Sequence, residues 1–156
     1  MSRAGSGSDS AVRPEAREVV VDASVWVSRC VPRDEHHRPS RRWLAARLEA
    51  GTILAAPTLL PLEVASAIAR RTGSVPHAGR VAASLLRMPV LRLVTLDPAF
   101  ITDAVTVATS LRLRGADSLY VAVARRLGVP LVTWDAEQLT RGSALVATFT
   151  PDTFPE

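Results

Sequence analysis

Four carboxylates stand at positions where an α/β sequence ordinarily has an apolar or a turn residue. They are Asp22, Glu63, Asp117 and Asp135. Asp22 and Asp135 end strongly apolar, strand-like runs over 19–21 and 131–134. Burying a carboxylate is costly unless the group is paired with, or bound to, a cation. Together, the four acids indicate a metal-binding acidic site.

The other two acids lie on the apolar stripes of amphipathic helices. Counted at i, i+3, i+4, i+7 and i+8 from Leu60, Glu63 is the only polar residue on its stripe. The same spacing from Leu113 places Asp117 at an inward-facing position. Neither stripe offers an obvious Arg or Lys. Both carboxylates are therefore expected to face the interior without a basic partner on the same stripe.

Each acid also has a purely structural interpretation. Asp117 follows Gly115 and Ala116 at a helix start, where Asp is favoured as an N-cap or first-turn residue. Asp135, with Gln138 three positions later, fits a capping box. Asp22 fits a turn-forming Asp after a strand. Glu63 is the hardest of the four to explain in this way.

The composition predicts one domain with an ordinary hydrophobic core. The chain has 156 residues, of which 47% are hydrophobic and 4% aromatic, so Ala, Val and Leu must build the core. No apolar run is long enough to span a membrane. We expect a disordered extension over 1–17, the domain over 18–150 and a C-terminal tail over 151–156. The single Cys30 and the lack of a signal-like segment favour a cytoplasmic protein.

The basic residues are all arginines, and this excludes several chemistries. A Walker A loop requires a lysine for the phosphates, and haloacid-dehalogenase-like phosphatases and receiver domains also rely on one. The net charge is +4 and the pI is near 10.8. This balance suits a polyanionic partner such as nucleic acid, although a solvated arginine-rich surface would give the same composition.

Strand-like and helical segments alternate along the chain. Strands are expected over 18–22, 52–56, 91–96, 130–134 and 144–148. Helices are expected as a short turn from 24 and over 41–49, 58–72, 76–87, 98–113, 115–127 and 136–140. This order predicts an α/β fold with a mainly parallel sheet of about five strands covered on both faces. Ligands of such sheets bind outside the carboxyl ends of the strands, so all four acids can converge at one edge.

The segments around the acids resemble the PIN-domain ribonucleases, in particular the VapC toxins of bacterial toxin–antitoxin pairs. The matching stretches are Val-Val-Val-Asp22-Ala-Ser24-Val-Trp26, Leu62-Glu63-Val64-Ala65, Gly115-Ala116-Asp117-Ser118-Leu119-Tyr120 and Leu131-Val132-Thr133-Trp134-Asp135. The likeness covers nearly everything after the extension. It implies a three-layer α/β/α PIN-like domain.

The resemblance also implies a metal site. Asp22, Glu63, Asp117 and Asp135 would hold Mg²⁺ or Mn²⁺, with Ser24 and Thr133 as hydroxyl-bearing neighbours that orient carboxylates or waters. Hard divalent cations prefer oxygen ligands. Four acids in one cleft would repel each other without a cation, and their pKa values should be raised.

The implied activity is metal-dependent hydrolysis of RNA by an endoribonuclease that forms a homodimer and is masked by a cognate antitoxin. Candidate RNA-binding residues are Arg41, Arg42, Arg70, Arg71, Arg112 and Arg114. Trp134 points to the opposite side of its strand from Thr133 and Asp135, which favours packing over stacking on a base. His36, His37 and His77 are expected at the surface.

Two other functions fit the same sequence. One is a PIN-like nuclease that acts in RNA processing, or on single-stranded DNA, outside toxin biology. The other is a non-catalytic module that binds RNA or protein and keeps a vestigial site, because arginine clusters need no metal to bind RNA. The presence of all four acids argues against the second.

Overall fold

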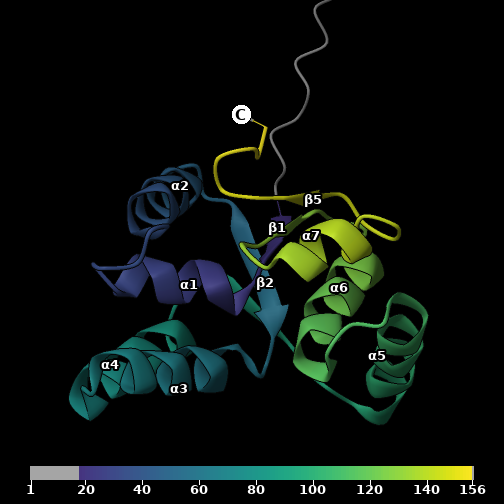
Figure 1. Ribbon diagram of the computed structural model, residues 1–156, viewed down its shortest axis with the longest axis horizontal. Coiled ribbons are helices and arrows are strands. Elements are labelled where there is room, and N and C mark those ends of the chain that lie inside the picture. The colour runs from purple at the N-terminus through teal and green to yellow at the C-terminus, as the bar shows by residue number, and fades with distance from the viewer. Residues whose placement is uncertain (1–17, 156) are drawn as a thin grey trace, which may run out of the picture.

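The computed structural model of the chain describes residues 18–155, so the expected extension over 1–17 lies outside the described residues. Within residues 18–155 the chain forms five strands and seven helices (Figure 1). The strands are β1 (Glu18–Val21), β2 (Ile53–Pro57), β3 (Leu91–Val94), β4 (Leu131–Val132) and β5 (Thr148–Phe149). The helices are α1 (Ala23–Cys30), α2 (His37–Glu49), α3 (Leu60–Thr72), α4 (Val75–Leu86), α5 (Pro98–Leu111), α6 (Gly115–Leu127) and α7 (Ala136–Gly142).

All five strands run parallel in one sheet, in the order β3-β2-β1-β4-β5. β1 lies at the centre, where Val20 is aligned with Ala55 of β2 and with Leu131 of β4. The three valines of β1 are fully buried, as expected for a strand covered on both faces. The chain builds the sheet outward from β1 in two directions, so the switch in strand order falls between β1 and β4.

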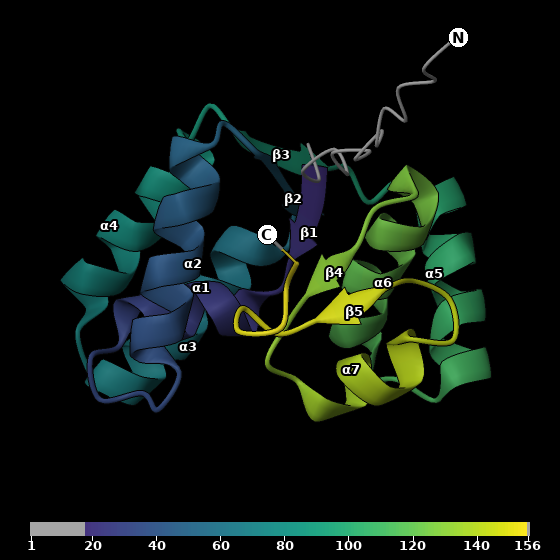
Figure 2. The same ribbon diagram turned by 90° about the horizontal axis from the view of Figure 1, so that it is seen from above.

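The helices form a layer on each side of this sheet. Figure 2 shows α1 to α4 on one side and α5 to α7 on the other. On the second side α6 packs directly on β1, β2 and β4, while α5 and α7 pack against α6. The predicted three-layer α/β/α class with a parallel sheet of five strands is confirmed.

Several predicted bounds are wrong. The short turn expected from residue 24 is the two-turn helix α1. Helix α2 begins at His37, four residues before the expected start, because Pro39 falls in the first helical turn, where a missing N–H removes no hydrogen bond. The last strand is β5 at 148–149. Residues 144–146 instead form turns, with the N–H groups of Leu145 and Val146 donating to Gly142 O.

The connection from α6 to β4 is tight and needs a glycine. Gly128 ends α6 with φ 67°, and its N–H donates to the carbonyls of Ala124 and Arg125. This left-handed conformation disfavours side chains with a Cβ. It turns the chain straight into β4, which ends beside the start of α1. None of the helices within residues 18–155 is long and apolar enough to cross a membrane.

Candidate active site

Asp22 follows β1 and is held by three donors. Its carboxylate is 4% exposed and caps α1, with Oδ2 accepting from Ser24 N at 3.0 Å and from Thr133 Oγ1 at 3.2 Å. Oδ1 accepts from Gln138 Nε2 at 3.0 Å. Three donors from three segments fix the orientation of this carboxylate. The turn-forming role considered for Asp22 is real, but it uses only one of its contacts.

Ser24 and Thr133 also join the segment after β4 to the start of α1. Trp134 N donates to Ser24 Oγ at 3.0 Å, and Asp135 N donates to Thr133 Oγ1 at 2.9 Å. Thr133 is fully buried. The carboxylate-orienting role expected for these hydroxyl residues agrees with the contact between Thr133 and Asp22. For Ser24, the direct donor to Asp22 is the backbone N–H.

Asp135 follows β4 and divides its two oxygens between two partners. Oδ1 accepts from Gln138 N at 2.8 Å and caps α7, so the capping interpretation is confirmed. Oδ2 accepts from Arg114 Nη2 at 3.2 Å. The cap therefore accounts for one oxygen and leaves the other facing α6. Asp135 therefore caps α7 and also belongs to the acidic edge, the edge of the sheet where Asp22, Glu63, Asp117 and Asp135 lie.

Asp117 lies in the first turn of α6, and Arg114 is its N-cap residue. Arg114 Nε donates to Asp117 Oδ2 at 2.8 Å, and the same guanidinium reaches Asp135. The expectation that the stripe itself offers no basic partner holds, but it did not foresee a basic partner from outside the stripe. Arg114 lies off the helical stripe but three residues before Asp117, within reach of its side chain. Burial, then the nearby Asp135, raise the pKa of Asp117, and Arg114 opposes this shift.

Gln138 is a site residue that sequence reasoning missed. It is fully buried, and its Nε2 donates to Asp22 Oδ1 at 3.0 Å and to Asp117 Oδ1 at 3.3 Å. In a capping box this side chain would reach back to the N-cap backbone. Here it turns toward two carboxylates instead. A neutral amide can lie between two acids because it donates two hydrogen bonds without adding charge.

Glu63 lies in the first turn of α3 and accepts from Tyr120 Oη at 2.5 Å. Burial raises the pKa of Glu63, and the nearby Asp22 and Asp117 raise it further. Tyr120 is 1% exposed, and burial together with Asp22 and Glu63 raises the pKa of its hydroxyl well above the usual range. Tyr120 therefore stays protonated and donates to Glu63. The helical stripe of α6 contained Tyr120, but its phenol was not recognised as a site group.

The fold thus brings the four acids of the sequence to one edge of the sheet. Within residues 18–155, however, no group of three His, Cys, Asp or Glu side chains is arranged to hold a metal ion. Donors lie between the acids instead. Gln138 joins Asp22 to Asp117, and Arg114 joins Asp117 to Asp135. The oxygen donor set fits a hard divalent cation such as Mg²⁺.

A cavity of about 630 Å³ opens beside this edge, between α1 and α3. Its lining includes Ser24, Glu63, Arg70, His36 and Trp134. The imidazole of His36 stacks on the Trp134 indole with 3.9 Å between ring centroids and 6° between planes. The expectation that Trp134 packs rather than stacks on a base agrees with this contact, because His36 covers one face of the ring.

The candidate RNA-binding arginines fall into two groups. Arg71 is paired with Asp34 at 2.6 Å, and Arg114 is paired within the acidic edge. Within residues 18–155 the others form no ion pair. They are Arg41, Arg42, Arg70 and Arg112. All six are exposed, so exposure alone does not separate them.

Comparison with protein-family models matches residues 19–142 to the PIN domain. No curated protein matches the sequence. Three solved structures share the fold. VapC20 of Mycobacterium tuberculosis, described as a toxin that cleaves the sarcin–ricin loop, is 19% identical with a TM-score of 0.66, over 81% of this chain and 94% of that one. FitAB bound to an IR36 DNA fragment is 14% identical with a TM-score of 0.64, over 88% of this chain and 98% of that one. PAE2754 of Pyrobaculum aerophilum is 26% identical with a TM-score of 0.58, over 84% of this chain and 82% of that one.

Proposed function

The chain belongs to the PIN-domain family, whose members are nucleases, and on that premise we propose that it is a divalent-metal-dependent endoribonuclease acting as the toxin of a toxin–antitoxin pair. The observation that supports this most is the meeting of Asp22, Asp117 and Asp135 around two shared donors, with Glu63 electrostatically coupled to them. Four separate segments supply these acids. Helix capping alone does not explain their convergence.

We assign Asp22, Glu63, Asp117 and Asp135 as the groups that would hold Mg²⁺ or Mn²⁺. A bound divalent cation supplies positive charge for the phosphodiester and makes water a stronger nucleophile near neutral pH. The protein's part is to aim its carboxylates. Thr133 and Ser24 N fix Asp22, and the protonated Tyr120 fixes Glu63. Residues that orient metal ligands by hydrogen bonds commonly affect both metal affinity and activity.

Arg114 has a second role in this proposal. Its side chain is 73% exposed, although its guanidinium contacts Asp117 and Asp135. A cation at the acids would take over the neutralisation that Arg114 now provides. The guanidinium could then turn to the RNA, since its planar donors suit phosphate oxygens. Arg114 would thus hold the two acids together before the cation binds and contact the substrate afterwards.

The biological setting is proposed from the structural relatives. VapC20 is described as a toxin, and FitAB was solved bound to DNA. By analogy, we propose that this chain is a homodimer in the cytoplasm and that a cognate antitoxin covers the acidic edge. RNA is the proposed substrate because the chain carries nineteen basic residues against fifteen acidic ones and because VapC20 is described as cleaving the sarcin–ricin loop.

The direct test is cleavage of a structured RNA by the purified chain. Cleavage should require Mg²⁺ or Mn²⁺, stop on addition of EDTA and return when excess Mg²⁺ is added. Asp117→Asn should be inactive. Asp103→Asn is the matched control, because Asp103 is an exposed acid of α5 paired with Arg126, in the last turn of α6, whereas Asp117 lies in the first turn. Cleavage that continues in EDTA would contradict the metal requirement, and cleavage by Asp117→Asn would contradict the site.

The toxin role has its own test. Expression of the wild type should arrest growth, expression of Asp117→Asn should not, and co-expression of a small neighbouring open reading frame should relieve the arrest. Active RNA cleavage without growth arrest would favour the alternative of a processing nuclease.

One observation favours a second candidate, a non-catalytic RNA-binding module. Gln138, Arg114 and Tyr120 already satisfy the four acids without a cation. A module of this kind would bind RNA equally well with EDTA and with Mg²⁺, and would never cleave it. The cleavage assay therefore separates the two functions.

A further inference from the structure

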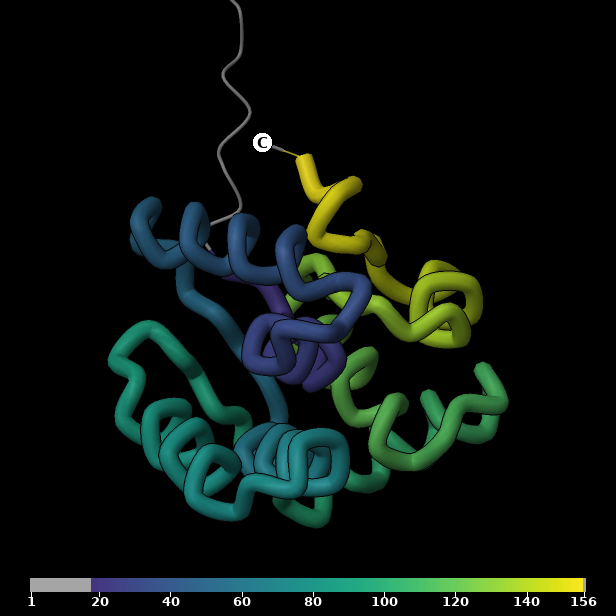
Figure 3. The backbone as a smooth tube through the Cα atoms, turned by 60° about the vertical axis from the view of Figure 1, so that its left-hand side comes forward, coloured from purple at the N-terminus to yellow at the C-terminus, as the bar shows by residue number. Residues whose placement is uncertain are grey.

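Helix α2 and the C-terminal segment Thr150–Pro155 enclose a second cavity, of about 400 Å³, that contains none of the four acids. Figure 3 shows this segment running back alongside α2. The contact is anchored by Phe154, which meets Trp43 edge-on with 5.4 Å between ring centroids. Both rings are 8% exposed. The cavity is therefore a defined feature of the packed chain.

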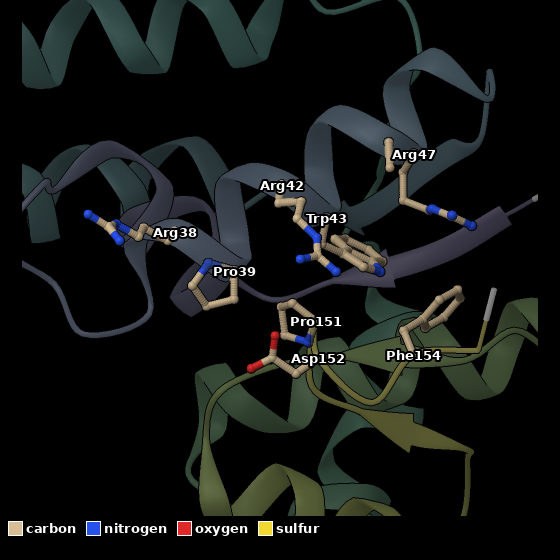
Figure 4. Close-up of a pocket in the computed structure, with 9 residues that line it drawn as sticks. Arg38, Pro39, Arg42, Trp43, Arg47, Pro151, Asp152 and Phe154 are labelled. Carbon is tan, nitrogen blue, oxygen red and sulfur yellow. The ribbon is translucent and has the colours of Figure 1, made fainter.

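Three arginines line this cavity, against one acid (Figure 4). They are Arg38, Arg42 and Arg47, and the acid is Asp152. Within residues 18–155 none of these arginines forms an ion pair. Arg38 and Arg42 are one helical turn apart, where like charges repel. The free protein keeps this repulsion, and a bound anion would relieve it.

Two buried donors at the same place have no partner. Trp43 Nε1 and Arg47 Nε are both buried, and neither has a hydrogen-bond partner among the described residues. A buried donor left unpaired costs free energy, so such groups are normally satisfied by protein, water or ligand. These two are N–H donors, as are the guanidinium groups around them. The polar groups around the cavity are therefore mainly donors, which favours a ligand rich in acceptors.

Helix α2 leads from the acidic edge to this cavity. Its first turn is fixed at the edge, because Trp134 Nε1 donates to Ser40 Oγ at 2.8 Å and His36 stacks on Trp134. From Arg38 to Arg47 the helix then rises about 14 Å. A cavity on the other flank of α2 is also lined by arginines, Arg29 and Arg41 among them. A polyanion held at the acidic edge can thus continue along α2 over basic surface.

We propose that the cavity between α2 and the C-terminal segment binds the sugar–phosphate backbone of the RNA a few nucleotides from the bond that is cut. Arg38 and Arg42 contact phosphate oxygens, and the Arg47 guanidinium adds positive charge beside them. This inference rests on the proposed function. Trp43 and Phe154 pack on each other, so neither ring is free to stack on a base, and binding here is independent of sequence. The same closed rings offer no apolar pocket to an acidic peptide.

The test is RNA binding by the full chain in EDTA, where no cleavage occurs, measured by fluorescence anisotropy. Arg38→Gln/Arg42→Gln is compared with Arg80→Gln/Arg87→Gln, which removes the same charge from α4 and its C-cap. Arg80 and Arg87 are exposed and form no ion pair within residues 18–155. The α2 variant should bind a single strand of about twenty nucleotides about tenfold more weakly. Its salt dependence should fall by about 0.7 in log–log slope for each phosphate that the variant no longer neutralises.

Substrate length gives a second readout. With Mg²⁺, the α2 variant should raise KM for the long strand and leave kcat unchanged. A strand of about four nucleotides, the low end of a single-strand binding site, is too short to reach the cavity from the acidic edge and should be cut as by the wild type. Equal losses in the α2 and α4 variants would overturn the proposal. So would a larger loss for a polyglutamate peptide than for RNA, which would assign the cavity to a protein segment.

The result also separates this inference from the proposed function. A wild type that cleaves no RNA, with binding still lost selectively in the α2 variant, removes the nuclease and keeps the cavity as an RNA site. Metal-dependent cleavage by the wild type, with unchanged RNA binding in the α2 variant, keeps the proposed nuclease and removes the cavity as an RNA site. In thermal unfolding monitored by circular dichroism, both double variants should be no less stable than the wild type, which shows that a loss of binding is not caused by unfolding.

Discussion

The acidic edge and the arginine-lined cavity on α2 differ in whether their charged side chains have partners within the chain. At the acidic edge every carboxylate has a donor within hydrogen-bond distance, supplied by Ser24, Thr133, Tyr120, Arg114 or Gln138. At the cavity the three arginines have no acidic partner among the described residues. The first region holds its carboxylates in fixed orientations, as a site that positions reacting groups must. The second holds uncompensated charge, which suits binding of a mobile polyanion.

Asp22→Asn should break this contrast most strongly. It removes the most buried of the four acids and keeps the shape of the side chain. We expect RNA cleavage to fall by more than about a hundredfold, since changes to groups that merely orient ligands already cost about ten- to a hundredfold. RNA binding in EDTA should be unchanged because the α2 arginines are intact. Loss of both cleavage and binding would show that the two regions are not independent.

Thr133→Val should have the next largest effect. The change removes one donor to Asp22 and the acceptor of Asp135 N, with little change in volume. Cleavage should fall by about ten- to a hundredfold, and chemical denaturation should show a stability loss of about 1–3 kcal/mol because a buried N–H loses its partner. Thr140→Val, an exposed threonine of α7, is the control and should change neither.

Metal binding should stabilise the chain only through the acidic edge. At a free Mn²⁺ concentration about a hundred times Kd, the stability gain should be about 2.7 kcal/mol. Thermal unfolding should show this gain in the wild type and in Arg38→Gln/Arg42→Gln, but not in Asp22→Asn. An equal gain in all three proteins would place the cation elsewhere.

Arg114→Gln tests whether this guanidinium competes with the cation. Removing it takes positive charge away from Asp117 and Asp135, so Mn²⁺ should bind a few fold more tightly in isothermal titration calorimetry. RNA affinity should fall at the same time if Arg114 also contacts phosphate. Weaker Mn²⁺ binding would mean that Arg114 instead orients the two acids for the metal.

The smallest effect sharpens the contrast from the other side. Arg42→Gln should stabilise the free protein by about 0.2–0.5 kcal/mol, since it removes the repulsion with Arg38 one turn away. Urea denaturation measures this difference. A loss of stability would indicate that Arg42 forms an ion pair within the free protein and is not available to an external anion.

The sequence predicted the fold class, the convergence of the acids and most helix bounds, because apolar periodicity and Gly or Pro breaks are local signals. Gly73 and Gly128, for example, end α3 and α6 as expected. The roles of Gln138 and Arg114 were not predicted. Each depends on partners from a different segment, and Gln138 lies 116 positions after Asp22. Local patterns assign Gln138 to a helix cap and contain no information about the carboxylates that it joins.

The unpaired donors of Trp43 and Arg47 were beyond sequence reasoning for the same reason. Trp43 is buried on the inward side of α2. Whether its N–H has an acceptor depends on where the C-terminal segment packs against α2. The sequence of that segment has no apolar periodicity that would predict this packing. The last strand was misplaced because residues 144–148 read as strand-like, whereas only Thr148 and Phe149 pair with β4.

The pairing of β1 with β4 also controls when the acidic edge can form during synthesis. β1 is the first described strand to leave the ribosome, but its neighbour β4 follows more than a hundred residues later, and the hydrogen bond from Thr133 to Asp22 spans 111 positions. Contacts this distant along the chain form late and slowly. A nascent chain therefore lacks Thr133, Asp135 and Gln138 until more than a hundred residues have been added after β1. If the proposed function holds, the nascent chain cannot hydrolyse RNA before these residues have been added.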